Sequence, residues 1–428
     1  MKHSVLVVGS GGREHAIVRA LSRSPQVQTI YCAPGNAGIA DQAECVPIAD
    51  TDMQALLNFA VQHHIDLTVV GPEAALAAGI VDLFRQHGLT IFGHTRSATQ
   101  IESSKLFAKQ LMARHHIPTA DYCSFYNYNQ AIDYVRLHGF PIVLKYDGLA
   151  AGKGVVIAQS FEEADRTLRD MLVSNRYGQD RVVIEQYLTG PEFSFMCFVC
   201  GEHVYPMPLS QDHKRAFDGD SGPNTGGMGA YTPLPFITDE DRNYTLTHIL
   251  QPVAKAMTDE GLPLTGVLYA GLMKTPDGIR VIEFNARFGD PETEVVLPLL
   301  TSDAYDLLHA IASSYRPEPI HWRHEAVLGV VLASKGYPGH YDKSVPIFGL
   351  DACRCDIIHM GTRCEGDQLL TNGGRVLMCV ASAPTIEEAR RCVYDDIAHI
   401  QCSNLFYRTD IAYQGVEYQK SHKVPMEV

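Results

Sequence analysis

The chain has 428 residues, 46% of them hydrophobic and 20% charged, which suits roughly three packed domains and excludes a disordered polymer. Its formal charge of −14 argues against a nucleic-acid partner, since DNA and RNA bind basic surfaces. No apolar run approaches the ~18 residues of a membrane span, and residues 5–8 are too few for a signal sequence, so we expect a cytoplasmic protein without membrane contact.

Short apolar strands alternate with helical stretches over the first hundred residues. We expect strands at residues 4–8, 68–71 and 89–92, and helices after Gly12, at 52–62 and at 73–87. The alternation is typical of a doubly wound α/β domain on a parallel sheet, which we place at residues 1–103.

Three further units are expected along the rest of the chain. A helix at 105–115 ends before Pro118, because proline disfavours helical geometry in the preceding residue. Strands at 141–145, 154–158 and 181–186 with one helix at 161–173 predict a small α+β unit at residues 122–188. A larger unit takes residues 104–121 and 189–325, with strands at 195–199, 267–274 and 279–284. Residues 326–428, with strands at 326–333 and 375–381 and a helix at 385–399, are expected to form a compact α/β cap.

The glycine-rich segment at residues 9–15 follows a strand and opens a helix, so its backbone amides can hold a phosphate. Glu14 occupies the place of the third glycine of a dinucleotide fingerprint, and no acidic residue closes the strand at 29–32. We therefore favour a phosphate-bearing substrate over a nicotinamide dinucleotide, with a purely structural turn as the alternative.

A second glycine-rich segment, residues 145–154, runs between two expected strands and carries Lys145 and Lys153. Such a loop suits the covering of a triphosphate. It is not a Walker A loop, because Gly154 leads into an apolar strand instead of opening a helix. The alternative, a flexible hairpin with solvated lysines, leaves the number of glycines unexplained.

Glu283, Asn285 and Arg287 alternate along an expected strand and therefore share one face. A carboxylate and an amide oxygen suit magnesium, and an arginine can stabilise charge on a transferring phosphoryl group. The alternative is a half-exposed strand whose polar side faces water. The acidic, turn-like residues 288–292 favour a site.

Charged residues at 210–215 precede a glycine-rich loop at 222–229. We interpret this pair of segments as a lid or substrate clamp, with a solvated charged face as the alternative.

The eleven cysteines are scattered and odd in number, so reduced, packed thiols are the simplest interpretation. Cys197 and Cys200 lie in an apolar run without a second pair, which favours packing over a metal or redox role. The same interpretation applies to Cys353 and Cys355.

Seven motifs make the chain resemble the phosphoribosylamine–glycine ligase family, also called glycinamide ribonucleotide synthetases, of the ATP-grasp superfamily. They lie at residues 9–15, 34–38, 70–73, 147–154, 211–215, 222–231 and 283–292. The resemblance covers essentially the whole chain and implies a multidomain α/β and α+β protein with an ATP-grasp fold, a doubly wound N-terminal domain and a C-terminal α/β cap.

The resemblance also implies an activity, namely ATP-dependent ligation of glycine to 5-phosphoribosylamine in de novo purine biosynthesis. Glycine's carboxylate would attack the γ-phosphate of ATP to give glycyl phosphate, and the amine of phosphoribosylamine would then displace phosphate. The implied cofactors are ATP and Mg²⁺ or Mn²⁺. Catalysis would rest on positioning and charge neutralisation, and we expect a monomer.

The resemblance assigns roles by position in this sequence. The expected ATP-binding residues are Lys105, Lys145, Gly152, Lys153, Gly154, Glu185 and Glu192. The expected metal ligands are Glu283 and Asn285. The expected substrate contacts are Gly11, Gly12, Arg13, Asn36, Glu73, Asp212, Lys214 and Arg287. Catalytic roles are expected for Arg287, Lys145 and Asp212.

Three residues depart from the family's usual pattern. Gln186 and Pro191 stand where a second glutamate often accompanies Glu185 and Glu192, so one glutamate remains at each place and ATP binding is expected to persist. Glu294 stands where many relatives have glutamine. It would add negative charge near the metal ligands, or else face solvent.

Three competing functions are weighed against the ligase. A carboxylase of the biotin or aminoimidazole type would share the ATP loop and the Glu283–Asn285 pair, but residues 212–231 match the glycine ligases specifically. A nicotinamide-dependent oxidoreductase lacks its third glycine and ribose-binding acid. A nucleotide sensor would bind ATP without turnover, which the full set of phosphate and metal residues argues against.

Overall fold

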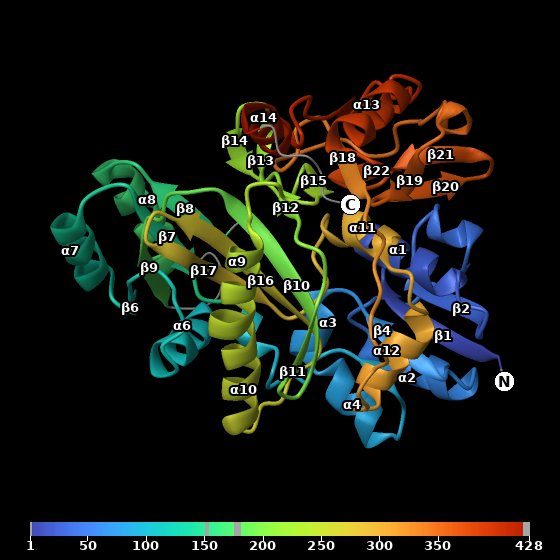
Figure 1. Ribbon diagram of the computed structural model, residues 1–428, viewed down its shortest axis with the longest axis horizontal. Helices are drawn as coiled ribbons and strands as arrows, with labels where there is room; N and C mark the ends of the chain where they lie inside the picture. Colours follow the sequence, from blue (N-terminus) through green and yellow to red (C-terminus); the bar gives the residue numbers. More distant parts are fainter. Residues whose placement is uncertain (1, 150–153, 175–180, 423–428) are drawn as a thin grey trace.

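A five-stranded parallel sheet with the strand order β3-β2-β1-β4-β5 forms the N-terminal part of the computed structural model (Figure 1), which describes residues 2–149, 154–174 and 181–422. Its strands are β1 (His3–Gly9), β2 (Val27–Pro34), β3 (Glu44–Cys45), β4 (Leu67–Val70) and β5 (Ile91–Phe92). The intervening helices are α1 (Gly12–Ser22), α2 (Met53–Gln62), α3 (Glu73–Ala78) and α4 (Ile80–Gln86). The prediction of a doubly wound α/β sheet is confirmed.

The single helix predicted at residues 73–87 is wrong, because the structure divides it between α3 and α4. Gly79 lies between the two helices with a φ of +98°. This left-handed backbone conformation ends a helix, and glycine adopts it without the steric penalty of a Cβ.

An antiparallel sheet, in the order β6-β9-β7-β8, forms the small unit at the far left of Figure 1. Its strands are β6 (Tyr122–Phe125), β7 (Ile142–Tyr146), β8 (Val155–Ala158) and β9 (Val182–Gln186). The helix α8 (Phe161–Leu172) is confirmed, but the prediction of one helix is wrong, since α7 (Tyr128–His138) also packs into this core. The side chain of Asn127 caps α7 by accepting hydrogen bonds from the amides of Asn129 and Gln130.

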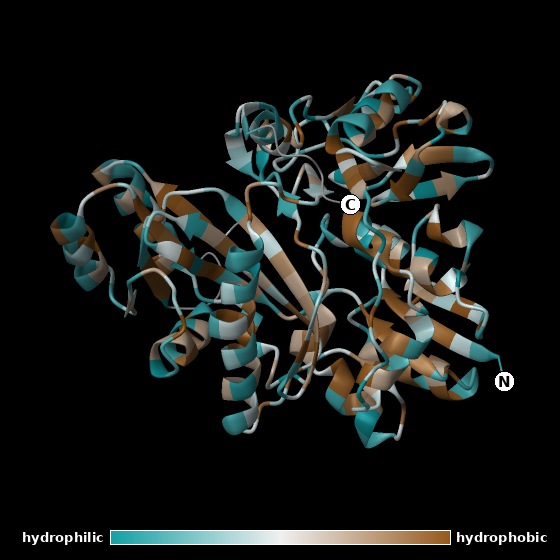
Figure 2. Cartoon of the chain, viewed as in Figure 1, coloured by the Kyte–Doolittle hydropathy of each residue, from teal (hydrophilic) through white to brown (hydrophobic). Residues whose placement is uncertain are grey.

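The central antiparallel sheet runs β11-β10-β16-β17. Its strands are β10 (Glu192–Cys200), β11 (His203–Pro206), β16 (Thr265–Thr275) and β17 (Gly278–Asn285). The helical segments are α5 (Gln100–Ser103), α6 (Lys105–Arg114), α9 (Asp239–Thr245), η2 (Leu246–Leu250), α10 (Gln251–Asp259), α11 (Thr293–Val296), η3 (Leu297–Leu299) and α12 (Ala304–Ala312). Hydrophobic residues dominate the paired strands β10 and β16 (Figure 2), which explains why they form the core of this part.

The third large sheet combines distant parts of the chain in the order β12-β15-β18-β22-β19, with β23 also paired to β18. Its strands are β12 (Gln211–Asp212), β15 (Gly229–Thr232), β18 (Ala326–Ser334), β19 (Asp356–His359), β22 (Arg375–Ala383) and β23 (Leu405–Phe406). Beside it lie α13 (Ile386–Ile397), α14 (Tyr413–His422), the short helices η1 (Ile39–Asp41) and η4 (Leu350–Ala352), and the pair β20 (Thr362–Glu365) and β21 (Gln368–Thr371). The C-terminal sheet therefore contains two strands from the middle of the chain.

The glycine loop predicted at residues 222–229 is partly strand. Two short strands, β13 (Arg215–Phe217) and β14 (Ser221–Asn224), pair as a hairpin, and β15 begins after residues 225–228. The sequence hides this hairpin because its strands are short and rich in glycine and polar residues. None of the described helices is both long and apolar enough to cross a membrane.

Candidate active site

A cleft of about 850 Å³ lies between these parts of the fold. Most of the expected site residues line it, namely Arg13, Glu73, Lys105, Lys145, Gly154, Glu185, Glu192, Asp212, Lys214, Glu283, Asn285 and Arg287. Eight lysines and arginines face nine aspartates and glutamates there, giving a formal charge of −1, whereas the whole chain carries −14. The basic residues are thus gathered where an anionic substrate can reach them.

Glu283 lies on β17 within reach of three lysines. Burial opposes ionisation of Glu283, but Lys214, Lys145 and Lys105 outweigh it and lower the pKa of the carboxyl group. Asn285 follows two residues later on the same strand. An ionised carboxylate beside an amide oxygen is a hard donor pair, which fits a divalent cation such as magnesium or manganese better than a soft metal.

Glu185 forms a buried ion pair with lysines from two elements. Its carboxylate lies 2.9 Å from Nζ of Lys145 on β7 and 2.8 Å from Nζ of Lys109 on α6. Lys145 also donates a hydrogen bond to the carbonyl of Ile282 at 2.9 Å, which joins the small sheet to β17. Burial lowers the pKa of Lys109 to about 8, with Lys145 adding to the effect against the opposing pull of Glu185. Lys109 was not predicted, although it lies four residues after Lys105 and hence on the same face of α6.

Lys105 stands in the first turn of α6, where the side chain of Ser104 caps the helix. Its Nζ donates a hydrogen bond to the carbonyl of Gly148 at 3.0 Å, at the start of the expected ATP loop. Burial lowers the pKa of Lys105, and Glu283 counteracts part of this effect. Gly152 and Lys153, which are expected to bind ATP, lie outside the described residues.

A second charged group on the cleft wall is centred on Glu73, at the start of α3. One carboxylate oxygen of Glu73 lies 3.5 Å from Nε of Arg287 and 4.0 Å from Nη1 of Arg13. Burial opposes the ionisation of Glu73, but Arg287 and Arg13 outweigh it and lower the pKa. Both arginines also donate to the carbonyl of Phe288, at 3.2 Å and 3.1 Å. Two guanidinium groups are therefore held side by side against one wall.

Glu102 supports Arg287 from the side of α5. Its carboxylate lies 3.4 Å from Nη2 of Arg287 and accepts a hydrogen bond from the amide of Ala286 at 2.7 Å. The sequence offers only a weak signal for this role, a carboxylate three residues before Lys105.

The residues Gly11, Gly12 and Asn36 are absent from the described lining of the cleft. The Asn36 side chain donates to the carbonyls of Ser10 and His359, both at 2.8 Å, and so ties the glycine loop to β19. A Cβ on Gly12 would lie 2.4 Å from Oε1 of Glu294, so a larger residue does not fit without movement. These three residues shape the loop that presents Arg13.

Of the two alternatives for Glu294, exposure to solvent is wrong. It is fully buried on α11, and neither carboxylate oxygen has a hydrogen-bonding partner among the described residues other than the nearby acid Asp290. Burial and Asp290 raise its pKa well above the usual value, while Arg375 opposes the shift.

Asp212 and Lys214 reach the cleft from β12 and the turn that follows it. Nζ of Lys214 lies 3.3 Å from Oε2 of Glu192. Burial opposes protonation of Lys214, but Glu192 and Glu283 outweigh it and raise the pKa. Burial and Glu292 raise the pKa of Asp212. The hairpin thus places one cation beside the expected metal ligand Glu283.

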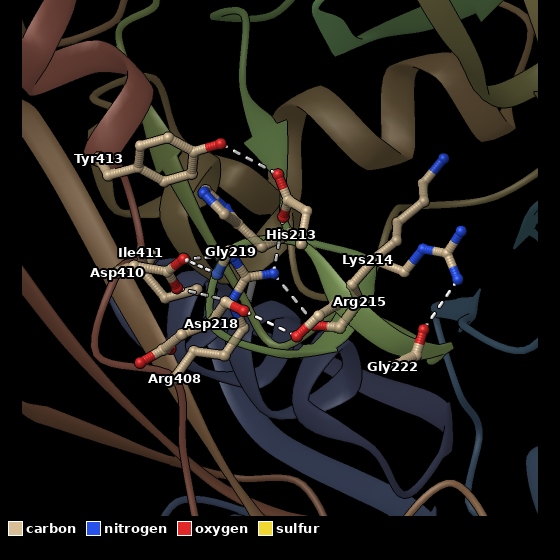
Figure 3. Close-up of polar contacts among 12 residues, drawn as sticks. His213, Lys214, Arg215, Asp218, Gly219, Gly222, Arg408, Asp410, Ile411 and Tyr413 are labelled. Atoms are coloured by element: carbon tan, nitrogen blue, oxygen red, sulfur yellow. Dashed lines mark hydrogen bonds and ion pairs between the residues drawn. The ribbon is translucent and has the colours of Figure 1, made fainter.

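The C-terminal segment holds this hairpin through Arg408, a fully buried arginine (Figure 3). Its guanidinium donates to both carboxylate oxygens of Asp410, at 2.7 and 2.8 Å, to Asp220 at 2.9 Å, and to the carbonyl of Arg215 at 3.1 Å. Figure 3 shows the side chain of Lys214 extending away from this cluster. The sequence gives no sign of the contact, since nearly two hundred residues separate its partners.

Arg375, the first residue of β22, is a cleft residue that the sequence did not indicate. Its Nη1 lies 2.9 Å from Oδ1 of Asp290 and donates to the carbonyls of Gly226 and Asp290, at 2.6 and 3.0 Å. The C-terminal sheet therefore contributes a cation to the wall. Nearby, Tyr269 donates to Glu292 at 2.6 Å in a buried hydrogen bond.

Three family models match consecutive parts of the chain. Residues 3–102 match the N domain of phosphoribosylglycinamide synthetase, residues 103–293 its ATP-grasp (A) domain, and residues 327–414 its C domain. Together they cover most of the chain.

Similar proteins carry a consistent description. The chain is 51% identical over 417 residues to the phosphoribosylamine–glycine ligase of Halalkalibacterium halodurans, covering 96% of this chain and 97% of that one. It is 48% identical over 427 residues to the protein of that description from Escherichia coli, covering 97% and 100%. The crystal structure of phosphoribosylamine–glycine ligase from Thermotoga maritima aligns with a TM-score of 0.85 at 31% identity, covering 96% and 100%.

A more distant likeness concerns the fold alone. The biotin carboxylase domain of the Hydrogenobacter thermophilus 2-oxoglutarate carboxylase aligns with a TM-score of 0.72 at 16% identity over the full length of both chains. The likeness is consistent with the ATP-grasp architecture.

Proposed function

The chain belongs to the phosphoribosylglycinamide synthetase family, and from this premise we propose that it is an ATP-dependent enzyme that joins glycine to 5-phosphoribosylamine. The products are glycinamide ribonucleotide, ADP and phosphate, and the reaction belongs to de novo purine biosynthesis. One observation carries the proposal on the structural side. The charges of three lysines favour the ionised form of Glu283 in the same cleft that holds the paired guanidinium groups of Arg13 and Arg287.

The proposed division of labour follows the four units of the chain. Residues 1–103 form one wall of the substrate site, residues 104–121 and 189–325 the catalytic core, residues 122–188 a lid over ATP, and residues 326–428 the closing wall. The family models that meet at residues 102 and 103 and the one that begins at residue 327 support the limits of the first and last units.

ATP is proposed to lie between the lid and the core. Lys145, Lys105, Leu149 and Gly154 line this part of the cleft, as do Glu185 and Glu192. The two lysines can neutralise the phosphates, because each reaches the space between lid and core from a different element. Gly152 and Lys153 are assigned to the same loop by resemblance.

Glu283 and Asn285 are proposed to hold Mg²⁺ or Mn²⁺, which would supply positive charge to offset that of the transferred phosphoryl group. Their oxygen donors suit such an ion. Lys214, Lys145 and Lys105 keep Glu283 ionised and so keep the donor set intact.

The chemistry proceeds in two displacement steps. A carboxylate oxygen of glycine attacks the γ-phosphorus of ATP and ADP leaves, which gives glycyl phosphate. The amine of phosphoribosylamine then attacks the acyl carbon, and phosphate leaves while the nitrogen loses a proton. Arg287 is proposed to stabilise the phosphoryl charge, with Lys145 and Asp212 assisting in the cleft.

The sugar phosphate is proposed to bind near Arg13 and the loop of Gly11 and Gly12, where the N-terminus of α1 adds its dipole. Glu73 would hold Arg13 and Arg287 in place for it. Asp212 and Lys214 are then placed to contact glycine on the opposite wall. Asn36 acts indirectly, by fixing the loop.

We further propose a cytoplasmic monomer. The eleven free cysteines suit a reducing compartment.

Phosphate release tests the proposal. ATP, a magnesium salt, glycine and freshly prepared phosphoribosylamine are supplied, and each is omitted in turn. Release is expected only with the complete mixture. Glu283→Gln should lower the rate by roughly 100-fold or more, because it removes the charged oxygen donor at the phosphoryl-transfer site.

Glu417→Gln is the matched control, since Glu417 is an exposed carboxylate on α14 outside the described cleft lining. It should leave the rate unchanged. Phosphate release that requires bicarbonate instead of glycine would mean that the enzyme is a carboxylase and not a glycine ligase. ATP binding without turnover in any mixture would mean that the protein is a nucleotide sensor and not an enzyme.

A further inference from the structure

Two thiols and a carboxylate converge in the C-terminal part of the fold, outside the described lining of the cleft. Sγ of Cys355, Sγ of Cys379 and a carboxylate oxygen of Asp396 lie within 4.8 Å of one another. They come from the residue preceding β19, from β22 and from the last turn of α13. The pairing of Ile357 with Cys379 in adjacent strands brings the two thiols to the same side of the sheet.

Hydrogen bonds orient these three groups toward one another. Oδ2 of Asp396 accepts the backbone amides of Arg354 and Cys355, both at 2.5 Å, which fixes the carboxylate. The thiol of Cys379 donates to the carbonyl of Val393 on α13 at 3.8 Å. Both hydrogen-bonded groups are thereby held beside the thiol of Cys355.

The surroundings favour a cation at this point. Asp396 stands at the C-terminal end of α13, where the helix dipole presents partial negative charge. A third sulfur is adjacent, since Sγ of Cys353 lies 3.6 Å from the carbonyl oxygen of Asp396. Cys379 is buried, whereas Cys355 is half-exposed. A cation can therefore reach the three groups from solvent on the side of Cys355.

We propose that Cys355, Cys379 and Asp396 form a binding site for a thiophilic divalent cation of the zinc class. Thiolates and a carboxylate are established zinc ligands, at about 2.3 Å and about 2.0–2.2 Å from the metal. Around a tetrahedral ion such ligand atoms are roughly 3.5–4 Å apart, so only a small contraction is required. Binding replaces the two thiol protons, which leave to solvent.

The spacing of Cys353 and Cys355 in the sequence favours a packing role over a metal site, because no second pair of cysteines lies nearby in the chain. The structure supplies the missing partner from a neighbouring strand. Packing alone does not require a fixed carboxylate at the thiols.

Cobalt(II) is a suitable probe, since its bonds to thiolate give an ultraviolet charge-transfer band that bonds to oxygen ligands do not. The full chain is prepared metal-free with a non-thiol reductant and titrated with Co²⁺. We expect the band to saturate at one ion per chain and to be displaced by Zn²⁺. In weak buffer, two protons should be released per Zn²⁺ bound. The oxygen donors Glu283 and Asn285 cannot produce this band.

Variants assign the band to the proposed ligands. Cys355→Ser and Cys379→Ser should abolish it, and Asp396→Asn should weaken binding about tenfold or more. Cys392→Ser, which removes an exposed thiol on α13 itself, is the matched control and should leave the titration unchanged.

If Cys379→Ser does not fold because Cys379 is buried, Cys355→Ser at the half-exposed position still tests the proposal. Absence of the band in the unaltered protein would overturn the proposal, as would a band of full intensity in Cys355→Ser. Ligase activity is measured separately in Cys355→Ser and should persist. Loss of metal binding and failure of the proposed function are therefore distinguishable.

Discussion

The ionisation of each carboxyl group in and around the cleft follows from its immediate neighbours. Glu283 and Glu73 face several cations, which outweigh burial and lower their pKa values. Asp212 and Glu294 face other carboxylates, which add to burial and raise theirs. The first pair is thus ionised at neutral pH and can hold cationic partners, whereas the second favours the protonated form.

Replacing Glu294 with glutamine should stabilise the protein at neutral and alkaline pH. The folded state retains the Glu294 proton above pH 4.5, the ordinary pKa, whereas the unfolded state loses it. Folding stability therefore falls as pH rises through this window, by up to about 1.4 kcal/mol per pH unit. Glutamine has no proton to lose and keeps a donor toward Asp290. Urea unfolding of both proteins between pH 4.5 and pH 8 measures the difference.

The advantage of Glu294→Gln should be smallest near pH 4.5 and grow with pH. Glu417→Gln, at an exposed position, should show no such trend. A difference that stays constant across the pH range would mean that Glu294 titrates normally in the folded protein.

At the scale of secondary-structure elements, the β13–β14 hairpin depends on a segment far from it in sequence. Arg408 links Asp410 to Asp220 and to the backbone of Arg215, and the amide of Thr409 donates to Asp218 at 2.8 Å. These contacts hold the strand that follows Lys214. The position of a cation in the cleft is therefore set partly by residues 408–410.

Arg408→Met should destabilise the protein by about 3–5 kcal/mol, because it leaves a buried ion-pair network without its cation. The methionine fills similar space, so the loss reports on charge and hydrogen bonding. We also expect the KM for glycine to rise relative to that for ATP, since Lys214 loses support while Lys105 and Lys145 do not. Thermal unfolding and steady-state kinetics check the two effects.

Arg391→Met, at an exposed arginine on α13, serves as the control and should be nearly neutral. Equal changes in the KM of both substrates would show that Arg408 supports the whole fold and not the hairpin in particular.

Local signals explain which elements could be predicted. Apolar runs and a proline boundary suffice for β1, α6 and β17, which form close to the expected residues. The helix α7 was missed, although Ala131, Ile132 and Val135 mark its buried face at helical spacing and Asn127 is a recognisable cap. The strands β12 to β15 are two to four residues long and depend on pairing partners elsewhere, so no local pattern marks them.

The residues of the candidate site also divide into those that a local motif identifies and those that it does not. Glycine loops and alternating polar residues identify Arg13, Lys145, Glu283 and other residues that the structure gathers in one cleft. Glu102, Arg375 and Arg408 have no such motif, because their importance comes from a partner that only folding brings near.

At the scale of the whole molecule, the cleft is a junction of separately packed parts. The small sheet with β7 and β9 contributes Lys145 and Glu185, and the hydrogen bond from Lys145 to the carbonyl of Ile282 joins it to the central sheet. A ligand that engages both parts adds contacts between them. Binding therefore favours the closed arrangement over an open one.

ATP with a magnesium salt should slow amide hydrogen exchange in β7, β8 and residues 147–149. At 100 times the dissociation constant, mass action limits the slowing to about 100-fold for openings that release the ligand. Exchange measured by mass spectrometry, with and without ATP, provides the comparison.

The hairpin of β20 and β21 is the internal control, because none of its residues belongs to the described cleft lining. Its exchange should not change. Unaltered exchange in β7 and β8 at saturating ATP would contradict a lid role for this unit.

The sheet that takes β12 and β15 from the middle of the chain has a consequence for the order of assembly. During synthesis, β15 emerges almost a hundred residues before β18, which pairs with it from Gly229↔Val330 to Thr232↔Val327. Arg408 emerges later still. The nascent chain therefore carries Lys214 and the β13–β14 hairpin without this support until residues 408–410 have left the ribosome. The wall that holds Lys214 is the last to be completed, so ATP turnover is expected to begin only after translation of the C-terminal sheet.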